Sequence, residues 1–589
     1  MLKQRSNISG RDRRELLERY NVNGALELAE QFRGETNEDG TKAVCKECLD
    51  IERGSCSFEP FFMADATDAR IEILPDEPQG VISPSIYGQF TEHIGGVIYD
   101  GVWVGEGSKI QNQYGIRATL IEALKKIKTP VVRWPGGCFA DSYDWMDGVG
   151  PAASRPERTN FWEVDPDAAR LHEQGKQVFE TNRFGTNEFM RFCALIGAQP
   201  YVAANVRSLS PLSFDRWVEY CNSPAGSTTL ARMREAAGFR EPFKVRYWGV
   251  GNESWGCGGN FTPEEYASEF RRFTTWVPRY GVDLQLIGSG PNNNDLDWTH
   301  RVFEELYSDH AYQNSSFTGW SIHYYAANLS RGKTNDWILG KGDALAFDGV
   351  DWYELMRVCS RIEGILQDQW AAMGQYDTAH QVKLVVDEYG PWYREGTEVD
   401  PTHIFGQQVT IRDALATALT LDCFNRNADK VSLATNAQLI NNINALFLAH
   451  EDQFVATPNY YVFEMYSSHA SGENLRTEFS SPSVQYTRDG QPAHFWGLNG
   501  SASQKGNVVT LTVVNPSLGS SLQTQVFLRD RKIRNASGSV LTPSDMHAHN
   551  TFDRPDAVKT APLPVMLSGG SVVVSFPHAS VSKIEITIA

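Results

Sequence analysis

Two glutamates stand where two predicted strands end. Glu253 follows the strand-like run 244–250, Glu388 follows the apolar run 384–387, and a turn-rich, aromatic stretch comes after each. Enzymes built on a barrel of parallel strands carry their catalytic groups at the carboxyl ends of those strands. One carboxyl group acting as an acid and another acting as a nucleophile are the minimum needed to cleave a glycosidic bond. The pattern therefore predicts glycosidic chemistry.

The two glutamates have different predicted roles. A general acid must keep its proton near neutral pH, and the apolar cover of Trp248 and Trp255 around Glu253 would favour the protonated form. Asn252 directly precedes Glu253 and can hydrogen-bond a sugar hydroxyl. Glu388 must instead be ionised to attack the anomeric carbon. Either glutamate alone would be read as a surface or ion-paired residue, but the pair favours catalysis.

Other predicted strand ends also carry polar or aromatic groups. Successive side chains of a strand point to opposite faces, so Asp387 should point away from Glu388 and have a structural role. Each remaining group, taken singly, is more simply a satisfied structural polar group. Together they predict a ring of hydrogen-bonding groups around one mouth, in which Arg133 keeps Glu388 ionised. The members of this ring are Glu92, His93, Arg133, His323, Tyr325 and Gln438, with Trp392 as a stacking surface.

Strand-like and helix-like segments alternate over residues 82–470. Such alternation predicts parallel strands joined by crossover helices, and eight units of this length predict an α/β fold with a closed (β/α)₈ TIM barrel as the catalytic domain. The predicted strands cover 85–90, 131–134, 200–205, 244–250, 284–288, 319–325, 383–388 and 431–439. The predicted helices include 121–127, 187–197, 263–276 and 411–426.

The residue pattern of the sequence changes after the predicted barrel. Residues 471–589 contain short β-rich runs separated by Gly, Asn, Ser and Pro, which is typical of a C-terminal β-sandwich. The segment 63–81 leads into the barrel, and its alternating run 70–74 is expected to add one strand to that sandwich. Residues 1–62 differ from the rest, with an amphipathic helix predicted over 11–33. Either translation begins at Met63, or 1–62 is a small appended helical element.

Cysteine spacing and charge exclude several classes of function. The nine cysteines are scattered, which argues against a disulfide framework, and Cys45, Cys48 and Cys56 lack a nearby fourth ligand for a zinc site. The formal net charge of −18 argues against nucleic acid and anionic membrane surfaces as partners. The chain has no apolar stretch of membrane-spanning length and no secretory signal, so we expect it to be cytoplasmic.

Four motifs resemble glycoside hydrolase family 51, the α-L-arabinofuranosidases. They are 87–95 (YGQFTEHIG), 133–143 (RWPGGCFADSY), 248–255 (WGVGNESW) and 387–389 (DEY), and the resemblance extends from Ile71 to Ala589. It implies that Glu253 is the acid/base and Glu388 the nucleophile, with substrate contacts at Glu92, Asn252, Tyr325 and Gln438. Many family members have Asn where this chain has Cys138, a weaker hydrogen-bonding group at a substrate-contact position. The resemblance also implies a homo-oligomer, frequently a hexamer.

These observations together predict a retaining exo-glycosidase. It would release terminal non-reducing α-L-arabinofuranosyl units from oligosaccharides derived from arabinoxylan or arabinan, with no metal and no organic cofactor. Two alternatives stay open, because a fold does not determine a substrate. One is a β-xylosidase or endoglucanase on the same scaffold, and the other is a carbohydrate-binding barrel without catalysis.

Overall fold

A computed structural model describes residues 68–164, 179–308, 316–543 and 545–589. The chain divides into two units, residues 1–66 and 67–589, and all described residues belong to the second unit. The predicted helix 11–33, Met63 and the cysteines at 45, 48 and 56 therefore lie outside the described residues.

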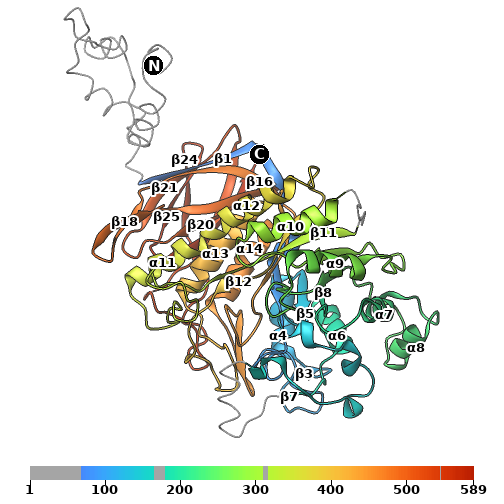
Figure 1. Ribbon diagram of the computed structural model, residues 1–589. Helices are drawn as coiled ribbons and strands as arrows, with labels where there is room; N and C mark the ends of the chain where they lie inside the picture. Colours follow the sequence, from blue (N-terminus) through green and yellow to red (C-terminus); the bar gives the residue numbers. More distant parts are fainter. Residues whose placement is uncertain (1–67, 165–178, 309–315, 544) are drawn as a thin grey trace, which may run out of the picture. The chain divides into compact units, whose positions relative to one another are not determined.

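Eight parallel strands close into a barrel in which spatial order follows chain order (Figure 1). The predicted TIM barrel is thereby confirmed. The strands are β2 (Gly88–Phe90), β5 (Val131–Trp134), β8 (Gln199–Ala204), β9 (Tyr247–Val250), β10 (Gln285–Gly288), β11 (Phe317–Ala326), β12 (Lys383–Pro391) and β13 (Val431–Asn436). The first strand is shorter than predicted, because Ser83 caps a 3-10 helix, η1 (Pro84–Tyr87), that takes the start of the segment.

Helices between the strands cover the outside of the barrel. They are α4 (Ala118–Ile127), α6 (Thr186–Ile196), α7 (Pro211–Asn222), α8 (Thr229–Ala236), α9 (Pro263–Thr274), α10 (Leu296–Tyr307), α11 (Gly349–Cys359), α12 (Arg361–Gly374) and α13 (Ile411–Arg426). Their sequences carry clear start signals. Helix α9 begins with Pro263 after Thr262, whose side chain forms a capping box with Glu265. Helix α13 has the same device in Thr410 and Asp413.

The barrel interior is filled by side chains rather than open. Val131, Tyr201, Ile287, Val385 and Leu433 form a buried cluster separate from the larger core between strands and helices. Filling by layers of this kind is usual in barrels of eight parallel strands. It leaves the mouth at the carboxyl ends of the strands as the place for a site.

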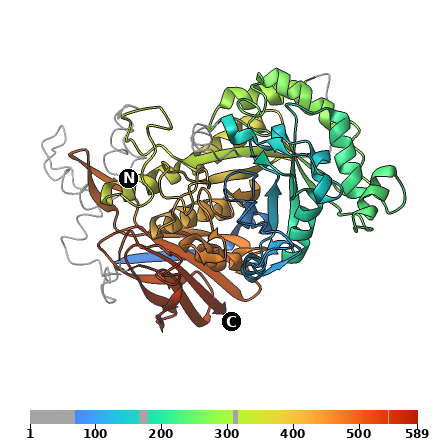
Figure 2. The ribbon, with the colours of Figure 1, turned by 90° about the horizontal axis from the view of Figure 1, so that it is seen from below.

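The C-terminal domain is built on a ten-stranded sheet. In spatial order its strands are β23 (Ala561–Leu563), β22 (Ile533–Leu541), β26 (Ser580–Ile588), β20 (Val508–Asn515), β19 (Asn499–Lys505), β16 (Glu473–Ser480), β1 (Ala69–Val81), β21 (Leu522–Leu528), β25 (Ser571–Phe576) and β24 (Val565–Ser568). Both halves of the sheet contribute to one core, as a sandwich requires. Figure 2 shows these strands in orange and red beside the barrel, with the blue strand β1 among them. The run 70–74, expected to add a strand here, lies in β1, which pairs with β16 and β21.

Helix α13 joins the barrel to this sheet. Nearly all of its residues are buried, and it packs against β19 and β20. Its Asp422 accepts hydrogen bonds from the hydroxyls of Ser501 and Thr512, both at 2.6 Å. The sheet therefore braces a helix that follows the strand carrying Glu388.

The remaining elements are short. They comprise η2 (Ala140–Ser142), η3 (Trp145–Gly148), η4 (Ala152–Ser154), η5 (Phe161–Val164), η6 (Ser467–His469), α14 (Pro458–Tyr466) and the pairs β3 (Asn112–Gln113)/β4 (Ile116–Arg117), β6 (Arg158–Thr159)/β7 (Phe179–Glu180), β14 (Phe447–His450)/β15 (Gln453–Ala456) and β17 (Val484–Arg488)/β18 (Gln491–Phe495). Within the described ranges, no helix combines the length and apolar character needed to cross a membrane.

Candidate active site

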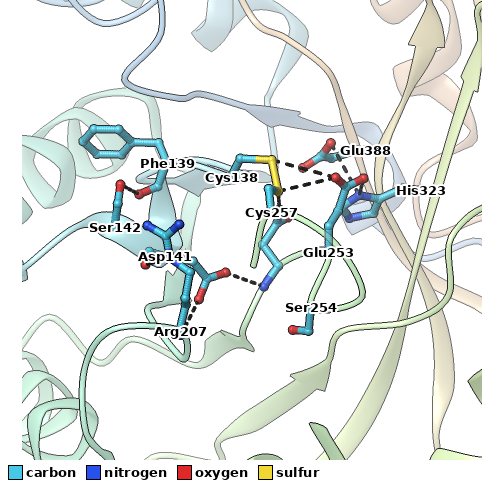
Figure 3. Close-up of a disulfide and its surroundings, with 12 residues drawn as sticks. Cys138, Phe139, Asp141, Ser142, Arg207, Glu253, Ser254, Cys257, His323 and Glu388 are labelled. Atoms are coloured by element: carbon cyan, nitrogen blue, oxygen red, sulfur yellow. Dashed lines mark hydrogen bonds and ion pairs between the residues drawn. A yellow bond between two sulfur atoms is a disulfide. The ribbon is translucent and has the colours of Figure 1, made fainter. Parts of the chain in front are cut away.

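Glu253 and Glu388 converge at the mouth of the barrel. Glu253 lies in the loop after β9, Glu388 lies in β12, and His323 of β11 stands between them. One carboxylate oxygen of each glutamate and one nitrogen of His323 all lie within 4.8 Å of one another. Figure 3 shows the three side chains pointing toward a common centre. In this arrangement both carboxyl groups could reach the same small part of a substrate.

Glu388 is fully held by hydrogen bonds. Arg133 of β5 donates from Nη1 to Oε1 at 2.8 Å, and the hydroxyl of Tyr325 donates to Oε2 at 2.8 Å. The Glu388 side chain is 8% exposed. Donors on both oxygens fix the direction of this carboxyl group. The sequence-based expectation that Arg133 pairs with Glu388 agrees with this geometry.

Asp387 does not point away from the site as strict strand alternation predicts. The pairing of β12 with both neighbouring strands shifts register around it, so Asp387 enters the barrel interior together with Glu388. Its carboxylate accepts from the hydroxyls of Ser321 at 2.6 Å and Tyr201 at 2.8 Å. Burial alone would raise the pKa of Asp387, but Arg133 and His323 hold that pKa well below its ordinary value. Its structural role is therefore to anchor two cations beneath the reacting carboxyls.

His323 is the cation between the carboxyl groups. Its Nδ1 lies 3.0 Å from Glu253 Oε1 and 3.4 Å from Glu388 Oε2, while its Nε2 lies 3.1 Å from Asp387 Oδ1. Burial lowers the pKa of His323, but Glu388 and Asp387 outweigh burial and raise it to about 10. His323 is therefore an imidazolium at neutral pH and orients all three carboxyl groups.

Glu253 is held mainly through its backbone. Its φ of 41° lies in the left-handed region, which non-glycine residues seldom adopt. The turn is fixed by the backbone N–H of Gly256, which donates to the Glu253 carbonyl at 2.7 Å, and by the N–H of Ser254, which donates to Ser289 Oγ at 3.0 Å. The Glu253 side chain is 21% exposed. Its position is thus set by the loop, while the carboxyl group faces the open mouth.

A disulfide joins Cys138 to Cys257 beside Glu253, which corrects the expectation that Cys138 offers a thiol. The sulfur atoms of Cys138 and Cys257 lie 3.8 and 3.7 Å from Glu253 Oε2 (Figure 3). Scattered cysteines argue against a disulfide framework, but they do not exclude one bond between two barrel loops. The partners are 119 residues apart in the chain, so no local spacing reveals the pair.

Glu92 and Gln438 form one wall of the site. Glu92 Oε1 accepts from the backbone N–H groups of Gly137 at 3.0 Å and Phe139 at 3.1 Å, and Gln438 Nε2 donates to Oε2 at 2.9 Å. Burial, followed by the nearby charge of Glu388, raises the pKa of Glu92 to about 7. A Cβ at Gly137 would lie 2.5 Å from Glu388 Oε1, so only glycine allows this wall to approach Glu388 so closely.

Asn252 links the two halves of the site. Its Oδ1 accepts from Arg133 Nη2 at 2.6 Å, and its backbone N–H donates to Asp141 Oδ2 at 3.0 Å. Asp141 also accepts from the backbone N–H of Val206 at 2.7 Å, and burial raises the pKa of Asp141 to about 7. Sequence reasoning did not select Asp141 as a site residue, although it lies inside the motif 133–143. The signal in the sequence that could have indicated Asp141 is that it is the only acidic residue of this motif.

Comparison with known proteins places this site in a family. Residues 123–331 match the domain family described as Alpha-L-arabinofuranosidase 1 domain, and residues 387–580 match the Alpha-L-arabinofuranosidase C-terminal domain. An intracellular exo-alpha-L-arabinofuranosidase of Bacteroides ovatus is 35% identical over 520 residues, which cover 88% of this chain and 95% of that protein. The chain belongs to glycoside hydrolase family 51.

Solved structures of family 51 agree with this assignment. The arabinofuranosidase of Xanthomonas axonopodis pv. citri is 34% identical with a TM-score of 0.79, and the alignment covers 88% of this chain and all (100%) of that one. The alpha-L-arabinofuranosidase of Thermotoga maritima, solved with arabinose, is 28% identical with a TM-score of 0.73 over the same shares, 88% and 100%. This chain is therefore a glycoside hydrolase with a TIM barrel and a C-terminal sheet domain.

An aromatic surface extends outward from Glu388 in this family 51 enzyme. The half-buried ring of Trp392 lies 5.1 Å from the ring of Tyr325 and 4.9 Å from the ring of Trp337. The ammonium group of Lys341 lies 4.1 Å from the Trp392 centroid, and Phe405 closes the other side at 5.2 Å. Trp392 was predictable from the sequence, but its neighbours were not, because they come from loops without a recognisable pattern. By contrast His93, which follows Glu92, is paired with Glu180 at 2.7 Å and is structural.

Three groups of side chains among the described residues have metal-like spacing. Cys138, Glu253 and Cys257 form one group, but both sulfurs are consumed by the disulfide. Glu253, His323 and Glu388 form the second. In this group the positive charge of the His323 imidazolium already compensates negative charge on the carboxyl groups. Asp100, His403 and His450 form the third, where the guanidinium of Arg117 lies 3.6 Å from Asp100 and already compensates its charge. Arg133 and His323 supply the positive charge that the carboxylates of the reacting centre need.

Proposed function

We propose that the chain is a retaining exo-α-L-arabinofuranosidase acting by double displacement. The observation that carries this proposal is the spacing of Glu253 and Glu388, whose nearest oxygens lie within 4.8 Å. Carboxyl groups of retaining glycosidases are about 5–5.5 Å apart, whereas those of inverting enzymes are about 6.5–9.5 Å apart to admit a water molecule. The short spacing leaves room for a sugar carbon between the two groups but not for an added water.

In the first step Glu388 attacks the anomeric carbon. Arg133 and Tyr325 hold the attacking carboxylate in position, and Glu253 protonates the departing glycosidic oxygen. The bond to the leaving group breaks as the bond to Glu388 forms, giving an arabinosyl-enzyme. The imidazolium of His323 stabilises the carboxylate that remains on Glu253.

In the second step water replaces the leaving group. Glu253, now ionised, removes a proton from a water molecule, which attacks the anomeric carbon and releases Glu388. The partial exposure of Glu253 suits this exchange, because its carboxyl group must meet both an alcohol and a water molecule. Two inversions at the same carbon give net retention.

The remaining residues are proposed to bind the arabinofuranosyl ring. Glu92, Asn252 and Gln438 present oxygens and amide groups around the site, and Tyr325 adds a hydroxyl beside the nucleophile. Trp392 offers an apolar face for the leaving group. Position 138 belongs to the same wall, where the disulfide sulfur replaces a polar side chain. Substrates would be terminal non-reducing α-L-arabinofuranosyl units on oligosaccharides from arabinoxylan or arabinan.

The experiment that tests the function follows hydrolysis of an aryl α-L-arabinofuranoside by NMR. A retaining enzyme gives α-L-arabinofuranose as the first product, before mutarotation. The β-anomer as first product would contradict the mechanism. A parallel panel of aryl β-xyloside and β-glucan tests the two alternative activities, and tight sugar binding without hydrolysis would support a non-catalytic barrel.

Location and assembly are part of the same proposal. The Bacteroides ovatus relative is named as intracellular, and this supports a cytoplasmic location for the present chain. We propose a homo-oligomer, with the hexamer expected from the family resemblance. Light scattering on the purified protein measures the subunit number, and a monomer at micromolar concentration would contradict it.

A further inference from the structure

The disulfide lies in direct contact with the proposed acid. Cys138 belongs to the loop after β5, Cys257 belongs to the loop after β9, and their bond ties these two loops together. Among the described residues, the sulfur atoms of Cys138 and Cys257 lie 3.8 and 3.7 Å from Glu253 Oε2. His323 holds the other oxygen of the same carboxyl group at 3.0 Å. Glu253 is therefore clamped between an imidazolium and a disulfide (Figure 3).

The loop that carries Cys257 has little freedom to move independently. A Cβ at Gly258 would lie 1.7 Å from the carbonyl oxygen of Asn252, so this loop packs directly on the backbone preceding Glu253. The N–H of Gly258 also donates to the Glu253 carbonyl at 3.2 Å. A displacement of Cys257 would thus pass to the left-handed turn at Glu253.

We propose that the Cys138–Cys257 disulfide is a positioning element for Glu253, and that its reduction weakens acid catalysis selectively. The proposal rests on the proposed role of Glu253 as acid/base. A disulfide has no proton to donate, so it leaves the proton on Oε2 for the substrate. Two thiols in its place would offer S–H donors to the ionised carboxylate and would favour that form. They would also separate beyond bonding distance and release the turn at Glu253.

The bond is open to exchange with a small dithiol. Both cysteines are half-buried, whereas the four free cysteines among the described residues, Cys193, Cys221, Cys359 and Cys423, are buried. A thiolate of the dithiol attacks one sulfur, breaks the Cys138–Cys257 bond and forms a mixed disulfide, and its second thiol then closes a ring. Two electrons and two protons pass to the protein, which yields two protein thiols and one cyclic disulfide. An oxidised dithiol reverses the reaction.

The test compares kcat/KM for two substrates on the full chain. An arabino-oligosaccharide has a poor leaving group that needs the acid, whereas a nitrophenyl arabinofuranoside does not. After dithiothreitol treatment, with thiols counted by mass spectrometry, kcat/KM should fall roughly tenfold for the oligosaccharide and less than about twofold for the aryl substrate. Reoxidation with oxidised dithiothreitol should restore it. Equal losses on both substrates, no loss after complete reduction, or free thiols at Cys138 and Cys257 in the untreated protein would each overturn the proposal.

Variants separate this pair from the other cysteines. Cys138→Ser and Cys257→Ser should each show the selective loss without any treatment and should not respond further to dithiothreitol. Cys359→Ser, a buried cysteine in α11, should respond as the wild type does. Glu253→Ala measured on the same substrates separates the proposed role of Glu253 from the proposed role of the disulfide. If Glu253→Ala lowers kcat/KM equally for both substrates, the proposed role of Glu253 as acid/base is contradicted. If it lowers kcat/KM only for the oligosaccharide and reduction has no effect, only the proposed role of the disulfide is contradicted.

Discussion

The surroundings of Glu388 and Glu253 differ although the two carboxyl groups face each other. Glu388 is almost enclosed and receives a guanidinium on one oxygen and a hydroxyl on the other. Glu253 is partly open, has a single ring nitrogen on Oε1 and meets sulfur atoms at Oε2. The first environment holds a carboxyl group rigidly between two donors, and the second leaves one carboxylate oxygen without a hydrogen-bond donor of nitrogen or oxygen type among the described residues. The roles proposed for Glu388 and Glu253, nucleophile and acid/base, thus correspond to different numbers of donors around the two carboxyl groups.

Charge balance below the site explains how both environments coexist. Arg133 and His323 together compensate Asp387 and Glu388, since both cations contact both carboxylates. The four groups form a neutral set, and Glu253 can be protonated or ionised without leaving a buried charge unpaired. We therefore expect Asp387 to support the proposed catalysis by positioning Arg133 and His323, without touching the substrate.

The largest effect should come from removing the enclosed carboxylate. Glu388→Gln keeps the side-chain volume but cannot form the arabinosyl-enzyme, so kcat should fall by roughly four orders of magnitude or more for every substrate. Steady-state kinetics measure the loss, and a circular dichroism melt confirms folding. Residual activity within about a hundredfold of wild type would show that the enclosed site is not the nucleophile.

The open carboxyl group should give a selective loss. Glu253→Ala should lower kcat/KM for arabino-oligosaccharides by roughly 10²–10⁴-fold, because protonation of the leaving group is lost. The loss for a nitrophenyl arabinofuranoside should be far smaller. Azide, which attacks without a base, should speed release of the arabinosyl-enzyme in this variant. Parallel losses on both substrates, with no effect of azide, would erase the distinction between the two carboxyl groups.

A smaller effect is expected from removing one donor of the enclosed site. Tyr325→Phe deletes the hydroxyl that donates to Glu388 Oε2, and a hydrogen bond to a charged group contributes about 1.5–3 kcal/mol. The loss in kcat/KM should therefore be roughly 10- to 100-fold and equal for good and poor leaving groups. Tyr324→Phe is the matched control, because its hydroxyl donates outward to the Val358 carbonyl at 2.5 Å. A loss confined to substrates with poor leaving groups would contradict this, because it would mean that Tyr325 supports Glu253 rather than Glu388.

The fold and the two glutamates could be predicted because their signals are local. Alternating segments predicted all eight barrel strands, and the two glutamates lie next to or within predicted strands, Glu253 just after β9 and Glu388 in β12. The disulfide could not be predicted, because its halves meet only when the barrel closes. Asp387 was misplaced because alternation assumes an unshifted register, and two register shifts surround it. The contacts between neighbouring barrel strands and loops therefore could not be predicted from the sequence.

The last effect concerns stability rather than activity and tests whether Glu388 carries a charge. Folding raises the pKa of Glu92 from an ordinary 4.5 to about 7, first through burial and then through the charge of Glu388. A raised carboxyl pKa stabilises the fold fully below pH 4.5 and loses that contribution as pH rises through 7. Glu92→Gln, which stays neutral, should therefore gain up to about 3 kcal/mol relative to wild type between pH 4.5 and 8. Unfolding midpoints at both pH values measure this gain.

A matched control and a second background make that measurement informative about the nucleophile. Glu106→Gln, at an exposed glutamate, should leave the stability difference between the two pH values unchanged. In the Glu388→Gln background the neighbouring charge is absent, so the pH-dependent gain from Glu92→Gln should shrink. An undiminished gain in that background would mean that burial alone acts on Glu92 and that Glu388 is not a fixed charge. The contrast between the two catalytic carboxyl groups would then lack its electrostatic basis, because an uncharged Glu388 needs neither Arg133 nor His323 beside it.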